Sequence, residues 1–212
     1  MNLNELRQNY TKNGLLEKDC PNEPLELFTK WFQEALDSKI PEPNAMTFST
    51  VTPKSTPNAR IVLLKEIANQ EFIFFTNYLS AKANEIEKNI NGSLLFFWVE
   101  LERQVRISGR VNRISQAKSE EYFRTRPRES QIGAWASHQS KVIANREELE
   151  EKFSELKEQF ADKEIPMPEF WGGYALTPSS IEFWQGRPSR LHDRIFYSKK
   201  LGTDWKRERL SP

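Results

Sequence analysis

The fold of this 212-residue chain is decided by two consecutive segments, Ser93-Leu94-Leu95-Phe96-Phe97-Trp98-Val99 and Gln104-Val105-Arg106-Ile107-Ser108-Gly109-Arg110-Val111-Asn112-Arg113-Ile114. Both segments are rich in β-branched and aromatic residues, and the polar stretch Glu100–Glu102 separates them. Such a pattern is typical of antiparallel strands joined by a short turn. It therefore predicts two neighbouring strands in the middle of the chain.

The same enrichment in β-branched and aromatic residues recurs in the sequence on both sides of these segments. Further strands are predicted at Thr47–Thr52, Arg60–Lys65, Glu71–Thr76, Trp171–Trp184, Arg190–Ser198 and Asp204–Leu210. Many short strands separated by turns favour an antiparallel barrel or sandwich. We expect a mainly β fold.

Helical patterns flank and interrupt these strands. A helix is predicted to begin at Pro24, because apolar residues follow it at helical spacing. These residues are Leu25, Phe28, Trp31, Phe32, Ala35 and Leu36. A short helix is expected at Ser80–Asn89, and a helical block from Ser115 to about Lys163, in which Asn145 and Glu148 form a capping box. The polar residues 1–20 predict a mobile arm, and residues 21–212 a single domain.

The bulk composition excludes several classes of protein. The formal net charge is +1 with 29% charged residues, so the chain lacks the basic character of a typical nucleic-acid binder. Because no segment is apolar enough to span a bilayer, we expect no membrane partner. The single Cys20 offers neither a disulfide nor a thiol pair for a metal. A cytoplasmic protein without a metal is expected.

A first anion site is predicted where Thr76-Asn77-Tyr78-Leu79-Ser80-Ala81-Lys82 leads from a strand into a helix, near the strand Arg60–Lys65. A cation in the first turn of a helix is poorly placed for the helix dipole, and an anionic ligand would explain it. The alternative is a surface lysine in an ordinary turn between a strand and a helix.

A second anion site is predicted at Tyr122-Phe123-Arg124-Thr125-Arg126-Pro127-Arg128-Glu129-Ser130. On a helix, Tyr122 and Arg126 share one face, and Ser130 can cap the helix that follows the proline. Arg124 and Arg128 point elsewhere and are interpreted as solvated. Two phosphate sites imply two phosphorylated ligands.

A third candidate is the run Ile181-Glu182-Phe183-Trp184-Gln185-Gly186-Arg187-Pro188-Ser189-Arg190-Leu191-His192-Asp193-Arg194. If the chain is extended there, Arg190, His192 and Arg194 project from one face and form a cationic surface. The alternative is an edge strand with solvated charges and a histidine that is already hydrogen-bonded.

This run and the two anion segments together resemble the pyridoxamine (pyridoxine) 5'-phosphate oxidase family, over nearly the whole chain. The resemblance implies an antiparallel FMN-binding split β-barrel with flanking α-helices, working as a homodimer. It implies oxidation of pyridoxamine 5'-phosphate and pyridoxine 5'-phosphate to pyridoxal 5'-phosphate, with dioxygen as acceptor and hydrogen peroxide as by-product. The sequence does not rank the two substrates.

The resemblance also implies roles for individual residues. Contacts to FMN are implied for Arg60, Ile61, Val62, Leu63, Leu64, Lys65, Phe75, Thr76, Ser80, Lys82, Gln104, Gln139, Ser140, Trp184 and Arg194, with Gln139 and Ser140 coming from the partner subunit. Contacts to the substrate are implied for Arg7, Tyr10, Lys65, Tyr122, Arg126, Ser130, Arg190 and His192, of which Arg190 and His192 face the pyridine ring as catalytic residues. Two positions depart from the family pattern, Ala81 in place of Arg and Phe75 in place of Tyr.

Three other functions are weighed. One is a split-barrel flavin or deazaflavin reductase acting on another substrate. The predicted substrate-phosphate segment Tyr122–Ser130 disfavours this function. Another is a non-catalytic carrier of pyridoxal phosphate or FMN, for which anion clamps alone suffice. A nucleic-acid module is disfavoured by the balanced charge.

Overall fold

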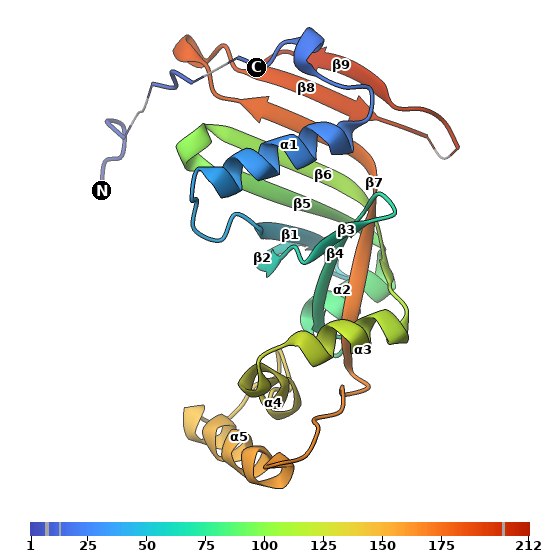
Figure 1. The fold of residues 1–212 in the computed structure, drawn as a ribbon. Coiled ribbons are helices and arrows are strands. Elements are labelled where there is room, and N and C mark those ends of the chain that lie inside the picture. Colours follow the sequence, from blue (N-terminus) through green and yellow to red (C-terminus); the bar gives the residue numbers. More distant parts are fainter. Residues whose placement is uncertain (7–8, 13, 201) are drawn as a thin grey trace.

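The computed structural model describes residues 1–6, 9–12, 14–200 and 202–212. In them, the strands form one antiparallel sheet that curves into a half-barrel, with α1 lying across it (Figure 1). The strands are β1 (Ala45–Val51), β2 (Pro57–Leu63), β3 (Glu66–Ala68), β4 (Glu71–Asn77), β5 (Asn91–Trp98), β6 (Arg103–Arg113), β7 (Trp171–Gln185), β8 (Asp193–Ser198) and β9 (Lys206–Leu210). The predicted mainly β fold is confirmed.

The long strand β7 holds the sheet together. One edge of β7 pairs with β6 along its length. The other edge is divided, because residues 171–176 pair with β4 and residues 180–185 pair with β8. The strand order is β2-β1-β5-β6-β7-β4-β3, and β8 and β9 continue the sheet beside the second half of β7.

A β-bulge separates the two halves of β7. Ser108 pairs with Ser180 and Gly109 pairs with Pro178, so Ser179 is an extra residue on β7. Side chains alternate between the faces of a strand, and the extra residue shifts this alternation by one. Tyr174 and Leu176 before the bulge and Ile181 and Phe183 after it are therefore buried in the same core.

The helices cover the sheet and extend one end of it. They are α1 (Pro24–Asp37), α2 (Ala81–Lys88), α3 (Gln116–Thr125), α4 (Arg128–Ala136) and α5 (Arg146–Phe160), with short 3₁₀ turns at Glu17–Asp19, Val99–Leu101 and Pro188–Arg190. On α1, Phe28 and Trp31 are buried as predicted, whereas Leu36 is exposed and Leu27 is buried in its place. The two predicted early helices are confirmed.

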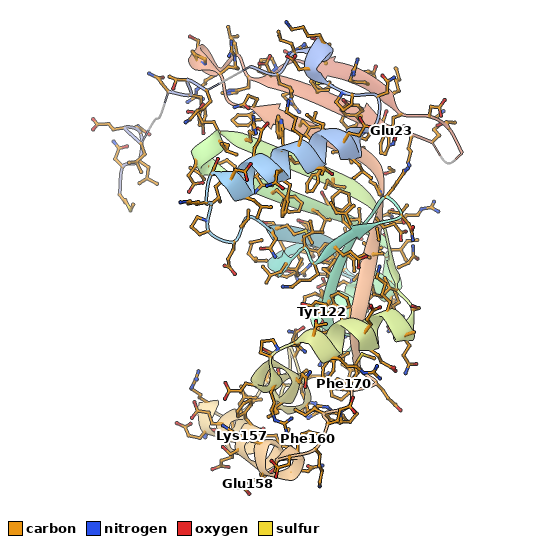
Figure 2. The ribbon with its side chains drawn as sticks, in the orientation of Figure 1. Glu23, Tyr122, Lys157, Glu158, Phe160 and Phe170 are labelled. Carbon is orange, nitrogen blue, oxygen red and sulfur yellow. The ribbon has the colours of Figure 1, made fainter. Side chains whose placement is uncertain are left out.

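The predicted helical block 115–163 is wrong as one unit, because it contains three helices with breaks at residues 126–127 and 137–145. These helices form a second apolar cluster around Phe123, Ile132, Phe160 and Trp171. Figure 2 shows Phe160 and Phe170 in this region, at the end of the molecule where Tyr122 lies on α3. The predicted capping box is confirmed only in its first half, since Asn145 Oδ1 accepts the Glu148 N–H at 2.9 Å. The Glu148 carboxylate accepts the Ala144 N–H, at 2.9 Å, rather than that of Asn145.

The observed strand bounds differ by a few residues from the predicted ones, and two of the differences concern the candidate sites. A strand over Arg190–Ser198 is wrong at its start, because Ser189 and Arg190 have φ of 57° and 61° and β8 begins only at Asp193. Arg190, His192 and Arg194 therefore do not form one extended row. The strand at Arg60–Lys65 ends at Leu63, because Leu64 and Lys65 turn the chain toward β3.

In the described part of the chain, no helix combines the length and the apolar character needed to cross a membrane.

The bulge makes a prediction about Gly109. A Cβ atom added there would lie 2.0 Å from the carbonyl oxygen of Thr177, so Gly109→Ala should force the two strands apart. We expect a loss of about 1–3 kcal/mol in the free energy of unfolding, measured by urea denaturation. The control is Gly133→Ala on α4, where a Cβ meets nothing within 4 Å and should stabilise the helix by roughly 0.5–1 kcal/mol. Equal stability of the two variants would contradict this account of the bulge.

Candidate active site

The main candidate site is a cavity of about 880 Å³ between β2, β4 and the helices α2, α3 and α4. It brings together most of the residues predicted for the two anion sites. They are Arg60, Ile61, Val62, Leu63, Lys65, Phe75, Thr76, Lys82, Tyr122, Arg126, Ser130 and Gln139. The two predicted anion sites therefore line one cavity, the first on the side of α2 and the second on the side of α3 and α4.

At one end, Lys82 lies in the first turn of α2 and is only 9% exposed. Its Nζ donates to Gln139 Oε1 at 2.8 Å, to Thr76 Oγ1 at 3.1 Å and to Ser80 Oγ at 3.4 Å. All three partners are neutral. Burial and the nearby Arg60 charge lower the pKa of Lys82 to about 8, although Glu85 opposes the shift. A buried cation with neutral partners is suited to an anionic ligand.

Arg60 lies beside Lys82 on β2. Its Nη2 forms an ion pair with Glu85 at 2.8 Å, and its Nη1 donates to Thr50 Oγ1 at 2.5 Å and to the Phe48 carbonyl at 3.2 Å. A guanidinium has five N–H donors. Those of Arg60 that remain are the Nε–H and one N–H of Nη2, so this side chain can still bind an anion.

At the other end, Tyr122 and Arg126 lie against aromatic rings. The Tyr122 ring stacks on Phe75 with centroids 3.9 Å apart, and the Arg126 guanidinium lies 4.6 Å from the centre of the Trp171 ring. Arg126 Nη1 is buried and has no hydrogen-bond partner among the described residues. Burial lowers the pKa of Arg126. This orphaned donor fits a second anionic group.

Three local predictions at this end are wrong. Arg128 is not simply solvated, because its guanidinium donates to backbone carbonyls of residues 160, 161 and 163 at the end of α5. Tyr122 and Arg126 do not share a helix face, because α3 ends at Thr125 and Arg126 is extended. Ser130 does not cap the next helix, because Pro127 occupies the cap position and Ser130 lies inside α4. Tyr122, Arg126 and Ser130 nevertheless line the same cavity, since the chain turns sharply at Pro127.

The remaining cofactor candidates of this region lie around the cavity. Leu64 and Ser80 are buried behind its wall. Ser140 is exposed with φ of 71°. The resemblance implies that Gln139 and Ser140 act from the partner subunit, whereas here Gln139 contacts Lys82 of its own chain.

A second cavity of about 640 Å³ contains the residues of the C-terminal run. Tyr10, Trp184, Arg187, Ser189, Arg190 and His192 line it, with Leu6 and Asn9. The rings of Trp184 and His192 lie 4.7 Å apart, and Tyr10 packs edge-on against both at 5.6 and 5.7 Å. The two cavities share no lining residue.

His192 has a defined tautomer in this cavity. Its Nδ1 accepts the Arg187 N–H at 3.1 Å, so the proton of the neutral ring lies on Nε2. Burial and the Arg190 charge lower the pKa of His192. Because its ordinary value is already below 7, His192 is a neutral hydrogen-bond donor at neutral pH.

Gln104 and Arg194 lie outside both cavities but beside Trp184. Gln104 on β6 and Arg194 on β8 both pair with Trp184 on β7. Arg194 Nε donates to Glu182 at 2.8 Å, and its Nη1 donates to the Ser211 carbonyl at 2.8 Å. The three predicted flavin contacts Gln104, Trp184 and Arg194 therefore form one row across three strands.

The N-terminal segment crosses the second cavity. The backbone N–H groups of Thr11 and Lys12 both donate to the Glu102 carboxylate at 3.0 Å, and the Leu15 N–H donates to Asp193 at 3.0 Å. These bonds hold Tyr10 against Trp184. Arg7, the other predicted residue of the arm, lies outside the described residues.

The described residues contain no group of three His, Cys, Asp or Glu side chains arranged for a metal ion. The half-barrel, with a cavity lined by the cations Lys82 and Arg126, is the architecture of a split-barrel protein with a candidate site for anionic ligands. Two family profiles match the chain, "Pyridoxamine 5'-phosphate oxidase" over residues 32–160 and "Pyridoxine 5'-phosphate oxidase C-terminal dimerisation region" over residues 171–212. The chain belongs to the pyridoxamine 5'-phosphate oxidase family.

Individual relatives agree with this assignment. Proteins named pyridoxine/pyridoxamine 5'-phosphate oxidase are similar over almost their whole length. That of a Nostoc species is 50% identical, covering 98% of this chain and 97% of its own, and that of Leptospira biflexa is 52% identical, covering 99% of each. Among solved structures, PhzG of Burkholderia lata, in complex with tetrahydrophenazine-1-carboxylic acid, has a TM-score of 0.89 at 30% identity, covering 95% of this chain and 99% of its own.

An FMN-binding protein of Nostoc punctiforme, related to pyridoxamine 5'-phosphate oxidase, has a TM-score of 0.72 at 16% identity, covering 90% of this chain and 98% of its own. This similarity concerns the fold, and it agrees with the predicted split barrel.

Sequence reasoning missed several residues of the site. Trp171 supports Arg126 but was interpreted only as the start of a strand. Glu85, which pairs with Arg60, had a signal, because it follows Lys82 by three residues on a short helix and such residues are neighbours. Glu102 had no such signal, because nothing in the sequence around it indicates that Thr11 and Lys12 of the N-terminal segment bind to its carboxylate.

The unpaired Nη1 donor of Arg126 leads to a prediction about stability and phosphate binding. Replacing Arg126 with the shorter, uncharged Met should raise the stability of the ligand-free protein by roughly 1 kcal/mol, because an unpaired buried donor is removed. The same change should reduce the stabilisation that inorganic phosphate gives to the original protein, and the part that remains should come from the site at Lys82 and Arg60. Thermal denaturation with and without phosphate measures both effects. A lower Tm without phosphate, or unchanged stabilisation by phosphate, would refute this role for Arg126.

Proposed function

We propose that this protein is an FMN-dependent oxidase that converts pyridoxamine 5'-phosphate and pyridoxine 5'-phosphate to pyridoxal 5'-phosphate, with dioxygen as acceptor and hydrogen peroxide as by-product. The observation that carries this proposal is one cavity lined by two cations, the buried Lys82 and the half-buried Arg126, whose Nη1 atom is buried. Two phosphorylated ligands could therefore bind with their phosphates apart and their ring systems toward each other. The relatives that bear this name at 50–52% identity support it.

FMN is proposed to bind with its phosphate at Lys82, Thr76 and Arg60. Ile61, Val62, Leu63 and Lys65 would border the rest of the cofactor, because they line the same cavity wall. Bound FMN would supply the redox chemistry, as the acceptor for a hydride from C4' of the vitamer and as the donor of electrons to dioxygen. The protein's task is to position both rings.

The substrate phosphate is proposed to bind at Arg126, Tyr122, Ser130 and Lys65. Charge-assisted hydrogen bonds from Arg126 and Lys65 would supply binding energy far from the reacting carbon. Arg190 would stack on the pyridine ring through its planar guanidinium. His192, neutral with its proton on Nε2, would donate a hydrogen bond to a polar group of the ring.

The active site is proposed to require a homodimer. Arg190 and His192 line a cavity that shares no residue with the phosphate cavity of the same chain. A second copy would bring its C-terminal run to the phosphate cavity of the first, and the twofold arrangement would create two equal sites. The profile that matches residues 171–212 describes a dimerisation region, which supports this arrangement.

Residues 21–212 are proposed to form a single domain, and residues 1–20 an arm that closes over the site. The bonds from Thr11 and Lys12 to Glu102 support a closed position of the arm. A cytoplasmic location is proposed from the lone thiol of Cys20.

A second candidate is oxidation of another ring substrate without a phosphate. PhzG, solved with tetrahydrophenazine-1-carboxylic acid, has a similar fold at 30% identity. Arg126, Lys65 and Tyr122 favour a phosphorylated substrate. The deciding experiment is a peroxide assay of the FMN-loaded protein with pyridoxamine 5'-phosphate and with unphosphorylated pyridoxamine. Turnover of only the phosphorylated form supports the proposal, and equal turnover of both rejects the second phosphate site.

Arg60 and Arg190 are predicted to have separable roles. Arg60→Ala should lower FMN affinity by at least about tenfold, since two charge-assisted hydrogen bonds to the phosphate are lost. Arg190→Ala should instead lower kcat/KM for pyridoxamine 5'-phosphate while leaving FMN affinity unchanged. Flavin fluorescence titration and steady-state kinetics of both variants test this. Equal loss of FMN in the two variants would contradict the assignment.

Ala81 is predicted to weaken the cofactor clamp. It is exposed at the first position of α2, next to Lys82, where the family commonly has Arg. Ala81→Arg should tighten FMN binding by one to two decades in Kd at most, equivalent to roughly 1.5–3 kcal/mol. Helix stability should change little, because arginine is nearly as good a helix former as alanine. An unchanged Kd at low and high salt would reject the missing-clamp interpretation.

A further inference from the structure

Glu85 is a buried carboxylate directly behind the cofactor end of the cavity, and it does not line the cavity itself. It lies on α2, is 5% exposed, and accepts three hydrogen bonds. Thr50 Oγ1 donates to Oε2 at 2.5 Å, Asn58 Nδ2 donates to Oε1 at 2.8 Å, and Arg60 Nη2 pairs with Oε2 at 2.8 Å. Because burial of a carboxylate is costly, this arrangement indicates a specific role for Glu85.

We propose that Glu85 is a positioning residue of the phosphate clamp, which fixes the Arg60 guanidinium and supplies the negative charge that allows Arg60 and Lys82 to lie side by side as cations. This inference rests on the proposed role of Arg60 and Lys82 in holding the FMN phosphate. Glu85 itself would not touch the phosphate.

The fixed orientation of Arg60 follows from its contacts. Thr50 links the two residues, since its hydroxyl accepts from Arg60 and donates to Glu85. Arg60 is therefore held on its Nη1 and Nη2 sides by β1 and α2, and its Nε–H and one Nη2 N–H remain for the ligand. A prearranged donor loses less side-chain entropy when the ligand binds.

The charge effect follows from the neighbours of Lys82. Lys82 and Glu85 are three residues apart on one helix and so are neighbours on its surface. From β2, Arg60 adds a positive charge, and the other cavity cations are Lys65 and Arg126. Thr76, Ser80 and Gln139, which bond to Nζ, are neutral. Glu85 is thus the one carboxylate among these described neighbours of Lys82.

The pKa values agree with this arrangement. Burial alone would raise the pKa of Glu85, but hydrogen bonds from Thr50 and Asn58 and the Arg60 charge hold it below its usual value. Burial and Arg60 lower the pKa of Lys82 to about 8, and Glu85 acts in the opposite direction. Loss of the Glu85 charge should therefore lower the pKa of Lys82 further. Since the protonated amine binds phosphate, affinity is present below this pKa and is lost as pH rises through it.

The test is the pH dependence of FMN binding by the apoprotein between pH 7 and 9.5. In the original protein, log Kd should begin to rise near pH 8. In Glu85→Gln, which keeps the shape but not the charge, the rise should begin at lower pH. For each pH unit by which the rise begins earlier, Kd on the alkaline side should be about tenfold larger, relative to the low-pH plateau of the same variant. Asn58→Ala removes a neutral donor to Glu85, preserves the charge, and should leave the midpoint unchanged.

Two further controls separate this inference from the proposed function. Riboflavin lacks the phosphate, so its affinity should show no such rise. Lys82→Met should abolish the rise for FMN, and if it does not, the assignment of Lys82 to the phosphate fails. If Lys82→Met abolishes the rise but Glu85→Gln leaves the midpoint where it was, only the role of Glu85 is overturned. If Glu85→Gln does not fold, Glu85→Asp replaces it in the test. This variant withdraws the charge by one methylene, so the midpoint should move in the same direction by a smaller amount. An unchanged midpoint in Glu85→Asp would overturn the proposal.

Discussion

The double pairing of β7 is the constraint on which the rest of the structure depends. Its first half pairs with β4 and so positions Phe75 and Thr76 in the wall of the phosphate cavity. Its second half pairs with β6 and β8 and so aligns Gln104, Trp184 and Arg194. A strand is stiff because both of its edges are hydrogen-bonded. The spacing between the two candidate half-sites of each chain is therefore set by backbone pairing rather than by the loops.

The cations of the cavity are supported in different ways. Arg60 has the Glu85 carboxylate, Lys82 has neutral oxygens, and Arg126 has the faces of Trp171 and Phe123. A buried charge is costly when unpaired, so these supports decide how much positive potential the cavity retains. The Glu85 pair lowers that potential at one end. At the other end, aromatic contacts leave the charge of Arg126 uncompensated and available to an anion.

Much of the architecture was predictable, because alternating β-branched and aromatic residues specify strands locally. Lys82 was identifiable for a similar reason, since a cation in the first turn of a helix conflicts with the helix dipole. The remaining features depend on distant partners. Arg126 is placed by Trp171 after the helix has ended, and Gln139 bonds to Lys82 from 57 residues further along the chain, after β5, β6, α3 and α4. Ser189 and Arg190 adopt positive φ values, which residues other than glycine rarely do, so an extended strand was expected there instead.

The extra residue at Ser179 has a consequence for how this strand can vary in related sequences. Removing one residue near the bulge would exchange the two faces of half the strand, so that Trp184 would turn into the core and Phe183 would turn out. Adding or removing two residues would preserve the faces but would displace Trp184 from Gln104 on β6 and from Arg194 on β8. Length changes in this segment should consequently be absent from functional relatives, whereas substitutions that respect the alternation should be frequent. An alignment that places a gap inside residues 171–185 is therefore an indication of misalignment or of a protein with another function.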